Sequence, residues 1–151
     1  MEKRPKILFL SAGDSTRGLM AEGFLKNLAG EHFQTASAAI EPGDPHPLAF
    51  EVMNEVGIDL SEQKSKTVAE SLRDHFSYVI VVYDASRERS PIFPFTPRLL
   101  RWSLTDPSNA PGSAIEKKEM FRRVRDEIHK YIQQFLNETG HAHQDRTPVA
   151  A

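Results

Sequence analysis

The sequence predicts a three-layer, doubly wound α/β fold built on a four-stranded parallel sheet. Two apolar runs, 6–10 and 78–83, have the length and composition of strands that are buried on both faces of a sheet. Segments with helical spacing of apolar residues alternate with the strand candidates along the chain, which is the order typical of doubly wound folds. No internal repeat is visible. These observations favour one parallel sheet with helices on both faces.

Four strands are expected. The run 78–83, Tyr-Val-Ile-Val-Val-Tyr, is the clearest because it is apolar and largely β-branched. The run 6–10 lies between charged residues and small residues. A weaker candidate covers 33–38, and the last strand is expected near 99–104, after a loop that contains Pro91, Pro94 and Pro97.

The helices are expected where apolar residues recur at three- to four-residue steps. The first covers 19–28, the second begins at Pro47 and stops at Gly57, and a short third helix falls within 68–76. The last helix is the most strongly marked, because Ser113 and Glu116 have the spacing of a capping box. Its apolar face comprises Phe121, Val124, Ile128, Ile132 and Phe135, and Gly140 ends it.

Length and composition indicate one ordinary globular domain. The chain has 151 residues, of which 39% are hydrophobic and 26% charged. We expect the domain to cover residues 1–139 and the polar segment 140–151 to form a disordered tail. No apolar run is long enough to span a bilayer, and the run 6–10 is too short for a signal sequence. A cytoplasmic location is therefore expected.

Charge and cysteine content exclude several function classes. The net charge of −2 gives no general reason to bind nucleic acid or an anionic membrane. The sequence contains no cysteine, which excludes disulfides, thiolate metal sites and thiol chemistry. We expect no metal and no cofactor.

The segment 11–18, Ser-Ala-Gly-Asp-Ser-Thr-Arg-Gly, carries the main functional signal. It follows the first strand and leads into a helix, so its backbone N–H groups and the helix dipole would meet at the carboxyl edge of the sheet. Arg17 adds a bidentate donor suited to tetrahedral oxyanions. The expected oxyanion-binding residues are Ala12, Gly13, Asp14, Ser15, Thr16 and Arg17. The alternative is a simple capped turn with an arginine at the surface.

The segment 8–23, with Ser11, Arg17 and Met-Ala-Glu at 20–22, resembles the signature of low-molecular-weight protein tyrosine phosphatases and of the thioredoxin-coupled arsenate reductases built on the same fold. The resemblance continues in register to Leu136. It runs through His46-Pro47, 56–61, 63–66, 81–84, 91–94, Trp102, Asp106-Pro107 and 121–128.

The resemblance implies a chemistry that this chain has largely lost. In the family a cysteine attacks phosphorus or arsenic, an arginine holds the oxyanion and an Asp-Pro aspartate protonates the leaving group. Here Ser11 stands at the nucleophile position, Arg17 at the arginine and Asp106 at the general acid. The two further redox cysteines of the arsenate reductases correspond to Tyr83 and Ser90. A thiol–disulfide relay is therefore excluded.

Two further departures lie in the segment itself. Gly18 replaces a hydroxyl residue that in the family hydrogen-bonds the nucleophile, and Asp14 replaces an asparagine. A serine hydroxyl also needs an adjacent base, and none is evident near Ser11. We interpret these changes as those of a natural degenerate homologue. An engineered removal of cysteines is the alternative.

The leading hypothesis is a non-catalytic protein that binds phosphate, sulfate or arsenate. The alternatives are a weak phosphatase that uses Ser11 or water with Asp106, and a scaffold for a protein partner. The partner would bind the loop Arg87–Arg101, where Arg87, Arg89, Arg98 and Arg101 form a basic stretch; a solvated surface is the plainer interpretation of these arginines.

Overall fold

The computed structural model describes residues 4–94 and 98–141. It contains one parallel sheet in the order β3-β2-β1-β4-β5. The strands are β1 (Lys6–Asp14), β2 (Gln34–Glu41), β3 (Lys66–Thr67), β4 (Tyr78–Tyr83) and β5 (Leu99–Ser103). The expected fold class is confirmed, with one correction: the sheet has five strands, not four. The additional strand, β3, is a two-residue pairing at the edge of β2, too short to leave a hydrophobic pattern in the sequence.

The helices are α1 (Thr16–Ala29), α2 (Pro47–Asn54), α3 (Val68–Ser71) and α4 (Ala114–Glu138). The expected capping box at the start of α4 is present, with Ser113 Oγ accepting from the Glu116 amide. Gly57 follows α2 at a φ of 81°, a conformation that favours glycine. No helix within the described ranges is long and apolar enough to cross a membrane.

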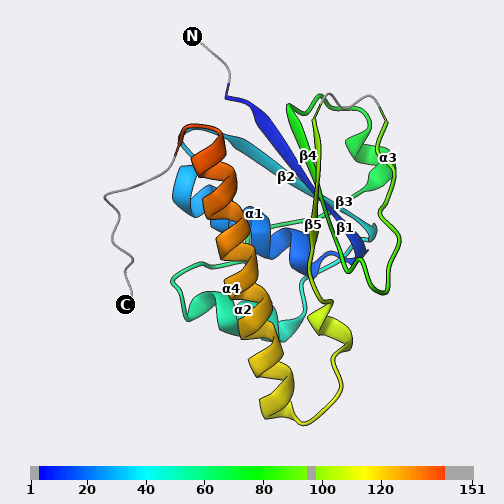
Figure 1. The fold of residues 1–151 in the computed structure, drawn as a ribbon, viewed down its shortest axis with the longest axis vertical. Helices are drawn as coiled ribbons and strands as arrows, with labels where there is room; N and C mark the ends of the chain where they lie inside the picture. Colours follow the sequence, from blue (N-terminus) through cyan, green and yellow to red (C-terminus); the bar gives the residue numbers. More distant parts are fainter. Residues whose placement is uncertain (1–3, 95–97, 142–151) are drawn as a thin grey trace.

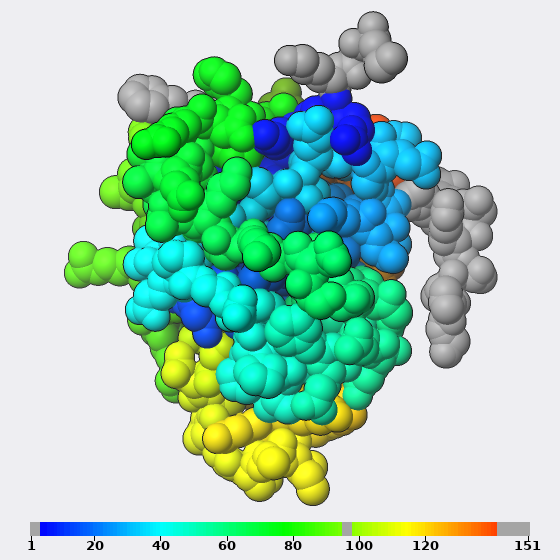
Figure 2. All heavy atoms as spheres, turned by 180° about the vertical axis from the view of Figure 1, so that it is seen from behind, coloured from blue at the N-terminus to red at the C-terminus, as the bar shows by residue number. Residues whose placement is uncertain are grey.

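The helices of the described residues lie on both faces of the sheet, with three helices on one face and one on the other (Figure 1). One face of the sheet packs against α1, α2 and α4, with Ile7 and Phe9 of β1 pointing into this larger core. The opposite face carries Leu8 and Leu10 and is covered by α3 and by Phe93. Seen from behind, the segments between β2 and β4, coloured cyan to green, cover most of the surface (Figure 2).

The central position of β1 determines where the site lies. This strand pairs with β2 on one side and with β4 on the other, and its interior residues are fully buried. Since all strands are parallel, their carboxyl ends meet at one edge, where α1 begins. At the far end of the chain, the His141 amide donates to the Leu136 carbonyl just after α4. Of the expected tail 140–151, residues 142–151 lie outside the described residues.

Candidate functional site

The segment after β1 is more extended than the sequence suggested. The strand continues through Asp14, with an irregularity in its pairing to β2 between Ser11 and Asp14, and only Ser15 separates it from α1. The expectation that the strand ends at Leu10 and an open loop follows is therefore wrong. Pairing of Asp14 with Glu41 extends the sheet into this segment.

Ser11, at the nucleophile position, is fully buried in the central strand. Its Oγ atom accepts a hydrogen bond of 2.9 Å from the Gly18 amide in the first turn of α1. A Cβ atom on residue 18 would lie 2.5 Å from that Oγ atom. A residue larger than glycine at position 18 would therefore displace the Ser11 hydroxyl from its present position.

Arg17 is the largest fully buried side chain in the described part of the protein. Its Nη1 and Nη2 atoms donate to the two carboxylate oxygens of Glu88 at 2.9 and 3.0 Å, and Nη1 also donates to the Leu104 carbonyl at 3.0 Å. The Nε atom is buried and has no hydrogen-bond partner among the described residues. The arginine thus binds a carboxylate through its planar fork and retains one unused donor.

Glu88 is the residue at this site that the sequence did not indicate. It lies in the turn after β4, and its Oε1 atom also accepts from the Asp84 amide at 2.6 Å. Its side chain is 22% exposed, so the carboxylate reaches from the surface to a fully buried cation. A lone acidic residue within a run of arginines was the only signal in the sequence. The 71 positions that separate it from Arg17 give no local pattern.

Asp106, at the general-acid position, does lie at the same edge. Its Oδ2 atom is 3.8 Å from the place where a Cβ on Gly13 would lie, and Glu88 Oε2 and Arg17 Nη2 lie 3.3 and 3.6 Å from that place. Gly13 is thus surrounded by the three charged groups, and a side chain here would crowd them. Asp106 caps the single 3-10 turn Pro107–Asn109 by accepting from the Ser108 amide and from the Asn109 side chain.

The side chains of Asp14, Ser15 and Thr16 form hydrogen bonds within the protein. Asp14 Oδ1 accepts from the Thr16 amide, so one N–H group at the start of α1 is occupied by a carboxylate. Ser15 donates to the Gly43 carbonyl, and Thr16 Oγ1 accepts from the His46 amide. These contacts fasten the start of α1 to the segment after β2. Ala12 lies half-buried between Ser11 and Gly13.

Behind the segment, Glu22 forms a buried polar support. Its carboxylate accepts hydrogen bonds from Thr35 and Ser37 of β2 at 2.7 and 2.8 Å. Ser37 is also 3.4 Å from the carbonyl oxygen of Gly18, the residue that binds Ser11. The first turn of α1 is therefore held from two sides.

Tyr83 and Ser90, at the two positions of the redox cysteines, contact different parts of the protein. Tyr83 ends β4 and packs against the smaller core, whereas the Ser90 hydroxyl accepts from Arg101 Nε at 3.1 Å. The basic stretch does not form one patch. Arg98 lies at the opposite end of the sheet, where its guanidinium contacts the ring and hydroxyl of Tyr78 at the start of β4.

The surroundings of Asp84, in the turn after β4, favour its ionised form. The pKa of Asp84 is lowered by the hydrogen bond from the Ser86 hydroxyl, and the nearby positive charges of Arg87 and Arg17 act in the same direction against the cost of burial. No group of three histidine or acidic side chains suited to a metal occurs in the described ranges.

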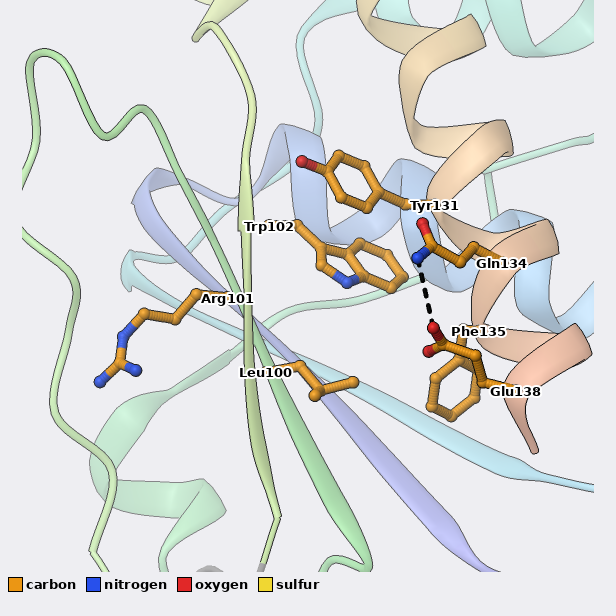
Figure 3. Close-up of a pocket in the computed structure, with 7 residues that line it drawn as sticks. All are labelled: Leu100, Arg101, Trp102, Tyr131, Gln134, Phe135 and Glu138. Atoms are coloured by element: carbon orange, nitrogen blue, oxygen red, sulfur yellow. Dashed lines mark hydrogen bonds between the residues drawn. The ribbon is translucent and has the colours of Figure 1, made fainter.

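A separate hollow lies on the face of the sheet that α4 covers. It has a volume of about 230 Å³ and lies between β5 and α4, where Trp102 stacks on Tyr131 at 4.9 Å (Figure 3). Arg101 points away from this hollow, toward the side on which Ser90 lies. Its lining contains none of the candidate site residues, so we do not include it in the site.

Comparison with known proteins agrees with this arrangement. The family model described as low molecular weight phosphotyrosine protein phosphatase matches residues 6–145. An arsenate reductase of Halalkalibacterium halodurans is 40% identical, over 89% of this chain and 96% of that protein. An arsenate reductase of Bacillus subtilis is 36% identical over the same shares.

Solved structures show the same fold. An arsenate reductase described in its phosphate binding state superposes with a TM-score of 0.74 at 28% identity, over 89% of this chain and 98% of that one. Vibrio vulnificus Wzb in complex with benzylphosphonate, at 20% identity, has a TM-score of 0.69 over 90% of this chain and 99% of its own. The chain therefore belongs to the low molecular weight phosphotyrosine protein phosphatase family, as a member without cysteine.

Proposed function

We propose that this chain is a non-catalytic member of its family that binds a small tetrahedral oxyanion, such as phosphate, sulfate or arsenate, through Arg17. The observation that carries the proposal is the fully buried guanidinium of Arg17, whose fork already holds a carboxylate at the carboxyl edge of the sheet. A buried guanidinium is stable only with an anionic partner. The position is therefore suited to a negative ligand.

The unused donor of Arg17 supports the same proposal. A carboxylate has two oxygen atoms, and both are engaged by Nη1 and Nη2, which leaves Nε without a partner. The Nε–H group lies on the other edge of the planar guanidinium, beside Nη2, and a tetrahedral oxyanion bound at that edge can satisfy this donor. The related arsenate reductase that is 28% identical is described in a phosphate binding state, which is consistent with this ligand class.

The loss of catalysis follows from the chemistry of residue 11. The Ser11 hydroxyl does not ionise near neutral pH, and its hydrogen bond from the Gly18 amide supplies no base. Arsenate reduction also needs thiols to carry electrons, and the sequence has none. Binding is thus the part of the family chemistry that these residues can still perform.

A thermal-shift titration tests the proposal. Phosphate, sulfate or arsenate at millimolar concentration should raise the melting temperature relative to chloride of equal ionic strength. The increase should be lost in Arg17→Lys, which keeps the charge but not the fork. It should persist in Arg123→Gln, which removes an exposed arginine of α4. No increase in the unmodified protein, or an equal increase in Arg17→Lys, would contradict oxyanion binding at Arg17.

One observation favours a second candidate, a weak phosphatase. Asp106 lies beside Gly13 and Arg17, where a general acid or base would be needed. Slow hydrolysis of a small aryl phosphate that is lost in both Ser11→Ala and Asp106→Asn would support it. Hydrolysis that survives both substitutions would point to a contaminating enzyme.

A further inference from the structure

Glu88 occupies the place at Arg17 that a bound oxyanion would need. Its two carboxylate oxygens lie 2.9 and 3.0 Å from the terminal nitrogens of Arg17, in the paired geometry by which a guanidinium binds carboxylates and phosphates alike. The Asp84 amide donates to the same carboxylate. Three donors from two segments thus surround one negative group that belongs to the chain itself.

A free oxyanion and Glu88 cannot share this position. Glu88 fills the edge of the guanidinium formed by Nη1 and Nη2, and an anion at the remaining edge, formed by Nε and Nη2, would still lie within a few ångströms of Glu88 and Asp106. Like charges at such separations repel strongly where water is largely excluded. The anion therefore has to displace the Glu88 carboxylate.

Glu88 is placed so that it can leave. It is partly exposed, whereas Arg17 is fully buried. It lies in a turn closed by hydrogen bonds from the Arg87 and Glu88 amides to the Asp84 carbonyl. The segment that follows is largely exposed, with Ile92 87% accessible. A movement of this turn would uncover Arg17 without disturbing the central strands.

We propose that Glu88 is an intramolecular competitor that closes the oxyanion site, and that anion binding at Arg17 releases the turn Asp84–Ser90. This inference rests on the proposed oxyanion binding and adds a conformational response to it. The protein then has two states, one with Arg17 bound to Glu88 and one with Arg17 bound to the external anion. The population of the closed state lowers the apparent affinity for the anion.

Substitution of Glu88 tests the competition directly. Glu88→Gln removes the charge at almost constant shape, and Glu88→Asp keeps the charge but shortens its reach. Isothermal titration with inorganic phosphate should give a Kd at least about tenfold lower for both variants than for the unmodified protein. Glu31→Gln, an exposed residue in the turn after α1, removes the same charge elsewhere and should leave the Kd unchanged.

Hydrogen exchange tests the conformational part. Phosphate should increase amide exchange in residues 84–90 of the unmodified protein, and Glu88→Gln should show this increase without phosphate. Equal phosphate affinity in Glu88→Gln and the unmodified protein would overturn the competition but leave oxyanion binding intact. Weaker binding by Glu88→Gln would make Glu88 part of the binding site and also overturn it. If no variant binds phosphate, the proposed function fails and this inference fails with it.

Discussion

The contact between Ser11 and Gly18 predicts that Gly18→Ala destabilises the protein, although it places a better helix former in α1. Alanine has an intrinsic advantage of about 1 kcal/mol over glycine inside a helix. Here, however, the new Cβ atom would lie 2.5 Å from Ser11 Oγ, well inside normal contact distance. Ser11 is fixed by pairing with Ala39 and Val82 in the middle of the sheet, so its hydroxyl has to rotate away.

The expected cost has two parts. Overpacking of a buried site typically costs about 1–3 kcal/mol. Rotation of the Ser11 hydroxyl also breaks the 2.9 Å hydrogen bond from the amide of residue 18, and an unsatisfied buried donor costs about 1–3 kcal/mol. After the helix advantage is subtracted, Gly18→Ala should lower the free energy of unfolding by about 3 kcal/mol, or the melting temperature by roughly 6–12 °C.

A double-mutant cycle measured by urea denaturation separates these contributions. In a Ser11→Ala background the nearest remaining atoms to the new Cβ belong to Phe9, at 3.6 Å or more. Gly18→Ala should then be neutral or stabilising, so the two substitutions should be coupled by about 3 kcal/mol. Gly23→Ala in the same helix is the matched control, because its Cβ would also be crowded, at 2.9 Å from a methyl carbon of Leu60, but has no contact with Ser11; its cost should be the same in both backgrounds. An equal cost of Gly18→Ala in both backgrounds would refute the reasoning.

Three further predictions concern stability elsewhere in the fold. Glu55 has a pKa of about 2, lowered from 4.5 chiefly by its hydrogen bonds from Arg122. Because Glu55 is partly exposed, Glu55→Gln should lower the free energy of unfolding by only about 1 kcal/mol at neutral pH. In urea titrations this difference in free energy between the two proteins should vanish as the pH falls from about 5 to about 2. Ser113→Ala should lower the free energy of unfolding by about 1 kcal/mol, because it removes the cap of the 25-residue α4. Thr67→Ala should lower the melting temperature less, because Thr67 caps only the four-residue α3. Trp102→Ala should cost about 3–5 kcal/mol in the same assay, because the indole packs against Phe9 and Tyr131.

Much of the fold was predictable because its signals are local. The strand 78–83 was predicted with its observed bounds, since a continuous β-branched run needs no information from the rest of the chain. The cap of α4 depends on residues three positions apart, Ser113 and Glu116. The boundary of β1 was not predictable in the same way, because its last residues are extended by pairing with Glu41 of another strand.

The site was predictable only in part. The resemblance placed Ser11, Arg17 and Asp106 in one region, and the structure brings these residues together at the carboxyl edge of the sheet. The partner of Arg17 could not be predicted, because the contact with Glu88 joins two segments that approach only after β1 and β4 pair. The sequence likewise groups Arg98 with Arg87 and Arg89 in one basic stretch, although Arg98 contacts Tyr78 at the opposite end of the sheet.

The covalent attachment of Glu88 to the fold has a consequence for sensitivity. A tethered group acts at an effective concentration of roughly millimolar or above, whatever the amount of protein in solution. Under the competition proposed here, the concentration of a free anion would have to approach this effective concentration before the anion replaced Glu88. The Glu88 carboxylate is held in place additionally by its hydrogen bond from the Asp84 amide. The protein would then bind little of an anion present at trace concentration and would bind anions that are present at millimolar concentration or above.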